Sequence, residues 1–459
     1  METTAVILAA GQGTRMKSKL PKVLHKALGK PMVQWVIDCL SDAGVAEKVA
    51  VLGHGSNLVE EVVGSQATVV YQTEQLGTGH AVMQAKDALK QKNSDCALVI
   101  CGDTPLLRAE TVRNLLELHE KEHNAVTVLT AVTDNPFGYG RILREGNQIL
   151  AIVEQKDATD EQKAIQEINT GTYCFDQKFL LESLPKLNTN NAQKEYYLTD
   201  LLKMANEEGL GVGGYVLEDF SESLGVNNRV QLSQAEAVLR ERKCKEVMLD
   251  GVTLIDPKAT YIGADVTIGR DTVIYPNVII EGKTVIGEDN VIGTNCRFVD
   301  SKIGNGNDIQ STVIVESTVG DDCKIGPMAY LRPNTVLHNQ VKIGDFVEVK
   351  KSEVGDGTKI PHLSYVGDSV VGKKVNVGCG SITCNYDGFK KFQTVINDGA
   401  FIGSNTNLVA PVEVEAGAFI AAGSTITENV PSDALALTRA ELKIKEEWAK
   451  KRREKHQNG

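Results

Sequence analysis

The feature that most constrains the fold of this chain is a six-residue period in its C-terminal half. Apolar residues recur at this interval, often followed by glycine, and the first series is Ile262, Ile268, Ile274, Ile280, Ile286, Ile292 and Phe298. The phase then shifts by a residue or two at several points, and the period resumes at Ile303 and Ile309; Val319, Ile325 and Leu331; Ile343 and Val349; Val354, Ile360 and Val366; Val371 and Val377; and Ile402, Leu408, Val414, Ile420 and Ile426. Hexapeptide repetition over this length is typical of a β-helix, so residues 261–426 are predicted to form a parallel β-helix.

Three hexapeptides would close one triangular coil of about eighteen residues, with the periodic side chains stacked inside and glycines at the turns. The few side chains that one coil buries do not offset the conformational entropy of its backbone, so a single coil is not stable. Stacked neighbours and an oligomeric face must supply the rest. The alternative is a β-sandwich rich in glycine, but a sandwich would not keep a six-residue period for so long.

The N-terminal half alternates short β-branched runs with amphipathic helical stretches. The predicted strands are AVILAAG, KVAVLG, ATVVYQ, CALVICGD, AVTVLTAV and GTYCF, and helical signals between them include MVQWVIDCLSDAG and TVRNLLELHEKEHN. This alternation predicts a Rossmann-like α/β domain, in which a mostly parallel sheet is covered by helices and binds ligands at the carboxyl ends of its strands.

A length of 459 residues exceeds what one hydrophobic core usually supports, so several domains are expected. The segment after the α/β half lacks Gly and Pro and has apolar groups at helical spacing; Asn227 or Asn228 would cap this helix and Asp250–Gly251 would end it. The predicted division is an α/β domain over 1–227, a linker helix over 228–250, the β-helix domain over 251–437 and a charge-rich, solvated helical tail over 438–459.

Composition narrows the class of protein. The N-terminus does not resemble a signal peptide and no 18-residue apolar stretch is present, so a cytoplasmic location without a membrane partner is expected. A net charge of −11 argues against nucleic acid as a partner. The nine cysteines are scattered without a C-x-x-C pair, which argues against zinc and against a disulfide framework.

A glycine-rich loop, LAAGQGTRMKSKLPK, follows the first predicted strand. Gly11 and Gly13 would let backbone N–H groups approach phosphate oxygens, and Arg15 and Lys22 would add positive charge. The loop is not G-x-G-x-x-G, because Met16 stands where the third glycine belongs. A simple tight turn is the alternative interpretation.

Three further segments favour nucleotide chemistry. Gln72 with the run QLGTGHA offers an amide suited to reading a base edge, and Asp103 stands just beyond a strand, where a carboxylate holds Mg²⁺ beside phosphates. The strings GYGRI, IVEQKDA and EINTGTY present Gly140, Glu154 and Asn169 as polar points at strand ends. A turn or helix cap would account for any one of these segments, but not for their joint order.

The predicted coil is interrupted in two places. The section 330–365 carries polar and charged residues on a scaffold otherwise poor in them, namely Arg332, Lys350, Lys351, His362 and Tyr365. The segment 381–398 then abandons the period, and a loop extruded from a regular coil usually has a ligand or a partner. The reference pKa of histidine, about 6.5, suits His362 to accepting a proton near neutral pH, although a lone histidine is more often structural.

These strings together resemble one family, the bacterial bifunctional N-acetylglucosamine-1-phosphate uridyltransferases and glucosamine-1-phosphate acetyltransferases. The resemblance covers residues 1–440 and rests on LAAGQGTRM, LPKVLH, EQLGTGHA, GDTPLL, FGYGRI, EINTGTY, GVNNR, YLRPNT, VEVKKS and CNYDG. It implies a left-handed β-helix, a homotrimer, and synthesis of UDP-N-acetylglucosamine, a precursor of cell wall and lipopolysaccharide. Some relatives have Tyr where this chain has Cys101.

The resemblance also implies roles for residues in the α/β domain, which would transfer uridylyl from UTP. The residues implied to line the nucleotide pocket are Leu8, Ala9, Ala10, Gly11, Gln72, Gly77 and Thr78. Arg15 and Lys22 would face the phosphates as catalytic groups, and Asp103 and Asn227 would ligate Mg²⁺. The N-acetylglucosamine moiety would be held by Gly140, Glu154 and Asn169.

In the β-helix, the resemblance implies acetyl transfer from acetyl-CoA to glucosamine-1-phosphate, with His362 as general base. The residues implied for the sugar phosphate are Arg332, Lys350, Tyr365, Asn376 and Lys391, and those for acetyl-CoA are Asn385, Tyr386, Ser404, Ala422 and Arg439. Two other hypotheses stay open at this point. One is a sugar nucleotidyltransferase of single activity with a trimerising coil, and the other is a non-catalytic coil with a binding face of threonines, although threonines are not seen at coil spacing.

Overall fold

The computed structural model describes residues 1–457, so the last two residues of the predicted tail, 458–459, lie outside the described residues. The chain divides into two compact units, Met1–Arg242 and Lys243–Gly459. The division falls within helix α9 (Arg229–Leu249), the helix predicted to link the domains. In the described part of the chain, no helix has the length and apolarity needed to span a bilayer.

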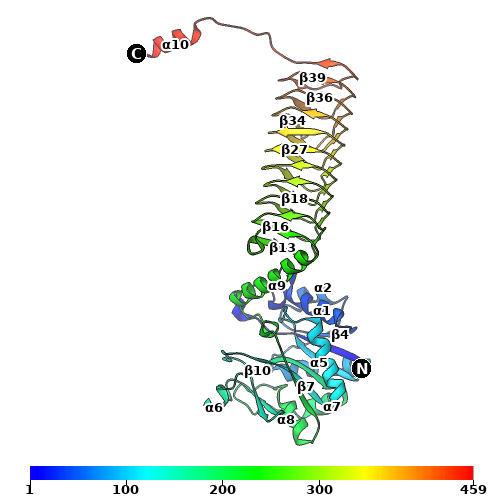
Figure 1. The fold of residues 1–459 in the computed structure, drawn as a ribbon, viewed down its shortest axis with the longest axis vertical. Helices are drawn as coiled ribbons and strands as arrows, with labels where there is room; N and C mark the ends of the chain where they lie inside the picture. The colour runs from blue at the N-terminus through cyan, green and yellow to red at the C-terminus, as the bar shows by residue number, and fades with distance from the viewer. Residues whose placement is uncertain (458–459) are drawn as a thin grey trace. The chain divides into compact units, whose positions relative to one another are not determined.

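The N-terminal unit is built on one twisted sheet with the strand order β11-β7-β10-β6-β1-β4-β5 (Figure 1). Its strands are β1 (Thr3–Ala9), β4 (Glu47–Leu52), β5 (Thr68–Tyr71), β6 (Cys96–Cys101), β7 (Val126–Val132), β10 (Glu167–Asp176) and β11 (Val212–Val216). Most neighbours are parallel, as predicted, but β10 runs antiparallel to both β6 and β7. A hairpin of β8 (Arg141–Glu145) and β9 (Gln148–Val153), which the sequence did not predict, joins β10.

Alternating strand side chains feed two cores on the two faces of this sheet. Val6 and Val99 pack with helices α3 (Thr78–Gln84), α4 (Lys86–Lys92), α7 (Gln177–Ser183) and α8 (Asp200–Glu207). Ile7 and Leu98 pack on the other face, with α1 (Met32–Asp42), α2 (Ser56–Val63) and α5 (Ala109–Glu122). Smaller elements are β2 (Lys26–Ala27), β3 (Lys30–Pro31) and α6 (Asp160–Lys163). The predicted α/β domain with a helix layer on each face is confirmed.

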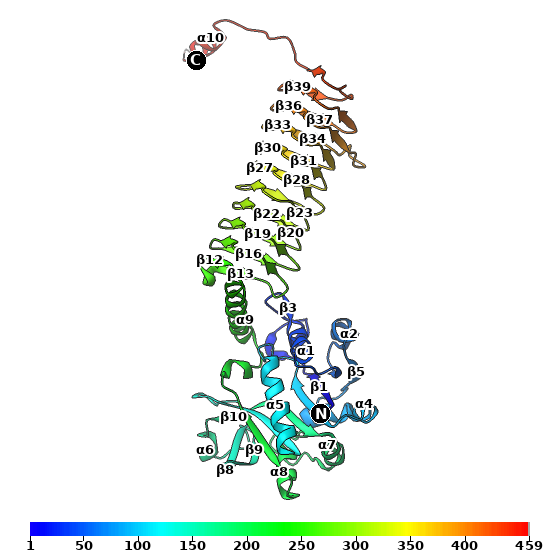
Figure 2. The same ribbon diagram turned by 45° about the vertical axis from the view of Figure 1, so that its right-hand side comes forward.

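The C-terminal unit stacks three parallel sheets as the sides of a prism, each contributing one short strand per coil (Figures 1 and 2). The first face comprises β12 (Thr253–Leu254), β15 (Val273–Ile274), β18 (Val291–Ile292), β21 (Asp308–Ile309), β24 (Lys324–Ile325), β27 (Lys342–Asp345), β30 (Lys359–His362), β33 (Asn376–Val377), β36 (Phe401–Ile402), β39 (Phe419–Ile420) and β41 (Leu435–Ala436). The second face comprises β13 (Thr260–Ile262), β16 (Val278–Glu281), β19 (Arg297–Val299), β22 (Val313–Val315), β25 (Tyr330–Leu331), β28 (Glu348–Lys350), β31 (Tyr365–Gly367), β34 (Ile382–Cys384), β37 (Asn407–Val409) and β40 (Thr425–Ile426). The third face comprises β14 (Thr267–Ile268), β17 (Val285–Ile286), β20 (Lys302–Ile303), β23 (Thr318–Val319), β26 (Val336–Leu337), β29 (Glu353–Val354), β32 (Ser369–Val371), β35 (Thr394–Ile396) and β38 (Val412–Val414).

The six-residue period marks the interior of this prism. Ile274 pairs with Ile292, one coil of 18 residues later, and both are fully buried. The other periodic residues are buried in the same core, except that Ile268 is only partly buried against it. The parallel β-helix of hexapeptide repeats is therefore confirmed.

Hydroxyl and amide side chains form a second ladder inside the coil. Ser301 N donates to Thr284 Oγ1 at 3.3 Å, and Ser317 N donates to Ser301 Oγ at 3.2 Å on the next coil. All three residues are buried. Threonine alone does not keep coil spacing, as expected, because serine takes its place on the later coils of this ladder.

One of the two predicted interruptions of the coil is wrong. Across 330–365 the strands stack without a break, and Leu331 pairs with Val349 and Val349 with Val366. The polar and charged residues singled out in this section point outward. The register of the strands is set by the inward-facing residues, which stay apolar. The second interruption is confirmed, since Val371 pairs with Ile396, 25 residues later, and residues 385–393 form an extruded loop.

The linker helix and the tail differ in how well the sequence predicted them. The side chain of Asn228 caps α9, since its Oδ1 accepts from Gln231 N at 2.9 Å, and Gly251 follows the helix at a φ of 96°. In the tail, the described helix is α10 (Trp448–Gln457) alone. Residues 438–447 carry no helix, so the tail is less helical than predicted.

Candidate active sites

The loop after β1 brings the first predicted cations inward. Gly13 has a φ of 62°, and a Cβ atom built on it would lie 2.7 Å from the Cβ of Lys22. Only glycine permits this close approach. Gly11, in contrast, has open space around it, with no atom within 4 Å of an added Cβ. The loop is therefore folded tightly at Gly13 and open at Gly11, where a ligand can approach the backbone.

Four predicted residues from three distant segments converge beside this loop. The Lys22 ammonium forms an ion pair with the Asp103 carboxylate and donates to Asn227 Oδ1 at 3.1 Å. Arg15 Nη2 donates to the same Asn227 oxygen at 2.9 Å. Two cations thus face a carboxylate and an amide oxygen, a set suited to phosphate and to a hard cation.

The position of Asn227 depends on its neighbours in the chain. Val226 N donates to Asp103 O at 2.9 Å, and Asn227 N donates to Gln231 Oε1 at 2.8 Å. Because Asn228 caps α9, the side chain of Asn227 is available to the site. From the sequence alone, either of these two asparagines could cap the helix.

A cavity of about 410 Å³ opens beside the cluster. Its lining residues are Arg15, Cys101, Asp103, Thr104, Phe137, Gly138, Tyr139, Thr170, Ser223, Gly225, Asn227 and Gln231. Burial raises the pKa of the Cys101 thiol to about 12, with Asp103 adding to the shift. Cys101 is therefore a neutral wall residue rather than a nucleophile.

The predicted sugar-binding residues form a second cluster in the same unit. Asn169 N donates to Gly140 O at 2.9 Å, and a Cβ on Gly140 would lie 3.3 Å from Glu154 Oε1. Burial and then the charge of Asp157 raise the pKa of Glu154. Their chain neighbours Tyr139 and Thr170 line the cavity, so the cluster adjoins it.

Two of the three predicted positions need correction. Glu154 does follow a strand end, but Gly140 precedes β8 and Asn169 lies inside β10, where the pairing with β7 shifts register before Tyr173. Asn169 stands just before this register shift, and its Nδ2 donates to Tyr173 Oη, on the far side of the shift, at 2.7 Å. A bulge inside a strand has no reliable sequence signal.

The segment predicted to read the base has a tight internal structure. Gln72 is almost fully buried, and its Nε2 donates to Gly77 O at 3.3 Å. Thr78 Oγ1 accepts from Leu198 N at 3.4 Å. Gln12 Nε2 donates to Gln75 Oε1 at 3.5 Å, which joins this segment to the glycine-rich loop. At the end of β1, Leu8 lies opposite Val51 and Cys101, with Ala9 and Ala10 following it as buried residues.

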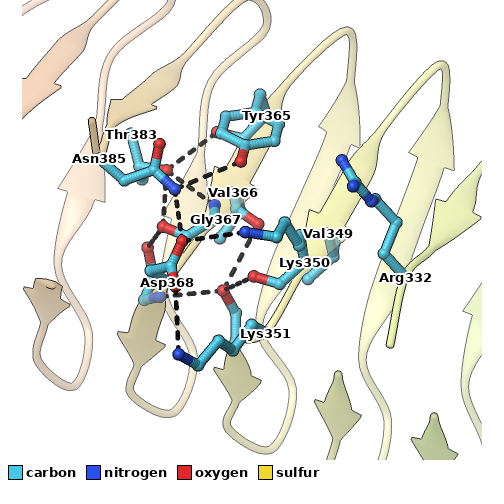
Figure 3. A network of polar contacts seen from close by, with 12 residues as sticks. Arg332, Val349, Lys350, Lys351, Tyr365, Val366, Gly367, Asp368, Thr383 and Asn385 are labelled. Atoms are coloured by element: carbon cyan, nitrogen blue, oxygen red, sulfur yellow. Dashed lines mark hydrogen bonds and ion pairs between the residues drawn. The ribbon is translucent and has the colours of Figure 1, made fainter. Parts of the chain in front are cut away.

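On the second face of the coil, Lys350 and Asn385 both contact Asp368, a residue that the sequence did not single out (Figure 3). Tyr365 joins this polar network through Asn385. The Asp368 carboxylate accepts from Asn385 Nδ2 at 2.6 Å and lies 3.4 Å from Lys350 Nζ. Asn385 Nδ2 also lies 3.3 Å from Tyr365 Oη. Three predicted residues from three successive coils are thus brought together.

Positive charge is concentrated around this network. Contact with the Lys350 amine lowers the pKa of Lys391, and the charge of Arg332 acts in the same direction. Arg332 itself pairs with Glu348, Nη1 to Oε1 at 2.7 Å. Lys351 Nζ lies 3.7 Å from Asp368 Oδ1, so two lysines contact this carboxylate, and Lys391 adjoins Lys350. The remaining positive charge suits a phosphate monoester.

His362 ends β30 on the first face, next to the corner that leads to the second face. Its Nδ1 lies 3.5 Å from Asp345 Oδ1, its register partner on the preceding coil, and about half of its side chain is exposed. A carboxylate beside Nδ1 favours the proton on that nitrogen, which leaves Nε2 to accept a proton from a ligand.

Asn376, Ser404, Ala422 and Arg439 are not brought to this network within one chain. Asn376 lies on the first face, whereas Lys350 and Tyr365 lie on the second. Ser404 and Ala422 occupy turns between these faces on later coils, with Gly423 N donating to Ser404 O at 2.8 Å. Tyr386 is exposed in the loop, where its backbone pairs with that of Lys391 in an isolated antiparallel bridge. Arg439 is exposed beyond the last strand.

Comparisons with known proteins agree with both halves of this description. Residues 5–169 match the MobA-like NTP transferase domain, and residues 265–300 match the bacterial transferase hexapeptide of six repeats. The chain is 54% identical over 446 residues to the bifunctional protein GlmU of Heliobacterium modesticaldum, covering 97% of each chain. It is 51% identical over 456 residues to that of Clostridioides difficile, covering 99% of each. The chain belongs to the GlmU family. Both the family resemblance and the fold predicted from the sequence are therefore confirmed.

Membership of the GlmU family makes this chain a bifunctional enzyme, with a nucleotidyltransferase domain and a hexapeptide acetyltransferase domain. The predicted function, synthesis of UDP-N-acetylglucosamine by the two activities, is confirmed at the level of the family. The alternatives of a single-activity enzyme and of a non-catalytic coil are not favoured, because the similarity to bifunctional GlmU proteins covers nearly the whole chain.

Sequence reasoning missed several residues that contact the predicted ones. Asp368 and Asp345 contact predicted residues directly, and Gln231 holds Asn227. The spacing carried a usable signal, since Asp345 precedes His362 by 17 residues and Asp368 follows Lys350 by 18, about one coil in each case. Once three hexapeptides are taken as a coil, residues one coil apart are neighbours.

Proposed function

We propose that the two units of this GlmU chain each carry one of its reactions, and that the sites are the clusters around Asp103 and around Lys350. The observation that carries the first assignment is the convergence of Arg15, Lys22, Asp103 and Asn227. The observation that carries the second is the cationic network on the coil, one turn from His362.

In the first reaction site, the phosphate oxygen of N-acetylglucosamine-1-phosphate attacks the α-phosphorus of UTP in line and expels pyrophosphate. A phosphate monoester is already anionic near neutral pH, so the protein mainly positions two anions and neutralises charge on the leaving group. Arg15 and Lys22 supply positive charge, and Gly140, Glu154 and Asn169 hold the sugar. The nucleotide lies against 8–11, with Gln72, Gly77 and Thr78 at the base.

Asp103 and Asn227 fit Mg²⁺, because each offers a hard oxygen and the Lys22 ammonium already bridges the two. When bound, the ion would offset phosphate charge in the transition state. In the described residues no group of three or more His, Cys, Asp or Glu forms a metal site, so phosphate and water would complete the coordination. Lys22 would then turn from the carboxylate to the phosphates.

In the second reaction site, the amine of glucosamine-1-phosphate attacks the thioester carbonyl carbon of acetyl-CoA. The C–N bond forms, His362 takes a proton from the amine nitrogen, and the C–S bond breaks to expel the thiolate of CoA, to which the protonated His362 returns that proton. Arg332, Lys350, Tyr365, Asn376 and Lys391 bind the sugar phosphate. Asn385, Tyr386, Ser404, Ala422 and Arg439 bind acetyl-CoA.

We propose a homotrimer, and the geometry of the second site supports it. Asn376 and Lys350 lie on different faces of one prism, so one chain cannot direct both at the same phosphate. Three prisms packed side by side would place the first face of one against the second face of the next. We also propose a cytoplasmic location and functional domains of 1–227, 228–250, 251–437 and 438–459.

The test is a coupled assay with glucosamine-1-phosphate, acetyl-CoA, UTP and Mg²⁺ that follows free thiol and pyrophosphate. Both products are expected, with pyrophosphate abolished by chelation of the metal and thiol release unaffected. Thiol without pyrophosphate would contradict the assignment of the N-terminal site.

A further inference from the structure

Asp368 occupies an unusual place in the coil. It forms the turn between β31 and β32 with a φ of 50°, and its side chain is 10% exposed. A buried carboxylate needs compensating partners. Its partners are Asn385 Nδ2 at 2.6 Å, Lys350 Nζ at 3.4 Å and Lys351 Nζ at 3.7 Å (Figure 3).

Other aspartates at turns of the coil have a different role. Asp321, Asp356 and Asp398 each accept a backbone N–H from an adjacent coil, at 2.7, 3.0 and 2.7 Å. Those contacts hold the stack together. The carboxylate of Asp368 contacts the side chains of Asn385, Lys350 and Lys351, and the first two are proposed to bind substrates.

Asp368 also holds both ends of the extruded loop 385–393. Its carboxylate binds Asn385 where the loop leaves β34, and its carbonyl accepts from Thr394 N at 3.3 Å where the loop returns. Its own N–H donates to Lys350 O at 2.9 Å. One residue therefore connects the base of the loop to the coil that carries Lys350.

We propose that Asp368 is a positioning residue of acetyl transfer, which fixes Asn385 at the base of the loop relative to the Lys350 amine. Through these contacts it couples the binding of acetyl-CoA to the binding of the sugar phosphate. This inference rests on the proposed roles of Asn385 and Lys350.

The test measures the KM values for acetyl-CoA and glucosamine-1-phosphate separately in Asp368→Ala and Asp368→Asn. Asp368→Ala is expected to raise the KM for acetyl-CoA by about tenfold or more, as for loss of a group that orients a ligand-binding residue. Asp368→Asn keeps an oxygen that accepts from Asn385, so it should restore that KM to within about threefold of the parent enzyme.

A second measurement detects the charge of Asp368. That charge contributes to the raised pKa of Lys350, after the contact with Lys391. In Asp368→Asn, the rise in the KM for glucosamine-1-phosphate at alkaline pH should therefore begin at lower pH. A purely structural role would not move this profile.

Asp356→Asn is the matched control, because it alters a turn aspartate that bonds to backbone. The asparagine keeps an oxygen that accepts from Asn339 N, so this variant should leave both KM values unchanged. Uridylyl transfer in every variant should equal that of the parent enzyme.

Asn385→Ala distinguishes a wrong role for Asp368 from a wrong acetyl-CoA site. If it raises the KM for acetyl-CoA while both Asp368 variants leave the KM values unchanged, the role of Asp368 is wrong and the proposed function stands. If Asn385→Ala has no effect either, the proposed acetyl-CoA site is wrong, and the inference is overturned with it.

Discussion

The two candidate sites of this chain are built in opposite ways. In the N-terminal unit, Arg15 and Asn227 are 212 residues apart in sequence and share one hydrogen bond beside a cavity. In the coil, Lys350 and Asp368 are 18 residues apart and meet on an outer face. A folded sheet can close a pocket within one chain, whereas a prism presents its residues outward, and the proposed site on it is shared with a neighbouring subunit.

The largest expected effect tests whether the N-terminal site is self-contained. Asp103→Asn removes the carboxylate that pairs with Lys22, and we expect uridylyl transfer to fall by about a thousandfold or more. Acetyl transfer should be unchanged. Both rates are measured on the same preparation, and a parallel loss of both with the fold intact would contradict separate sites.

The reciprocal change tests the coil. His362→Ala removes the proposed proton acceptor, so acetyl transfer should fall by roughly a hundredfold or more. Uridylyl transfer supplied with N-acetylglucosamine-1-phosphate should be unchanged. Substitution of another exposed histidine of the coil, His338→Ala, is the matched control and should leave acetyl transfer intact.

Mixing inactive chains sharpens the contrast between closed and shared sites. Because Lys350 and Asn376 lie on different faces of the prism, they are proposed to act from different subunits, and co-refolded Lys350→Ala and Asn376→Ala chains should regain about a quarter of the parental sites by random assembly. Arg15→Ala mixed with Asp103→Asn should regain no uridylyl transfer. Absence of recovery in the first mixture would place both residues in one subunit's site.

The smallest effect concerns stability. The pKa of Glu154 is raised in the folded unit, mainly by burial, so folding favours the protonated carboxyl. The stability from this preference is fully present below the unfolded pKa, near 4.5, and is lost as the pH rises through the folded pKa. Glu154→Gln should therefore unfold at a higher temperature than the parent at about pH 8, by a few degrees, and lose this advantage near pH 4.

Calorimetry of the N-terminal transition measures this difference. Glu182→Gln, a change at an exposed glutamate of the same unit, is the control and should not shift the midpoint at either pH. A lower midpoint for Glu154→Gln at pH 8 would show that the ionised carboxylate stabilises the fold.

Prediction from sequence worked best where one physical requirement repeats. Each of the three sides of a coil must place an apolar residue in the interior. The spacing of residues such as Ile274 and Ile292, one coil apart, therefore revealed the architecture. The same spacing did not reveal the ladder of Thr284 and Ser301. Several polar residue types can accept the backbone N–H at such a position, so no single residue type repeats there. It also did not reveal the bulge at Asn169 or the hairpin of β8 and β9.

The sequence by itself determined the six-residue coil, the α/β alternation before it and the motifs that resemble the GlmU family. Burial patterns and short loops are local properties of a chain, so a linear reading recovers them. Only the tertiary structure decided that Asn228 caps the helix while Asn227 turns to Lys22, and that Asp368 joins Lys350 to Asn385. Those choices depend on contacts between distant segments, which form only when the backbone has already been placed.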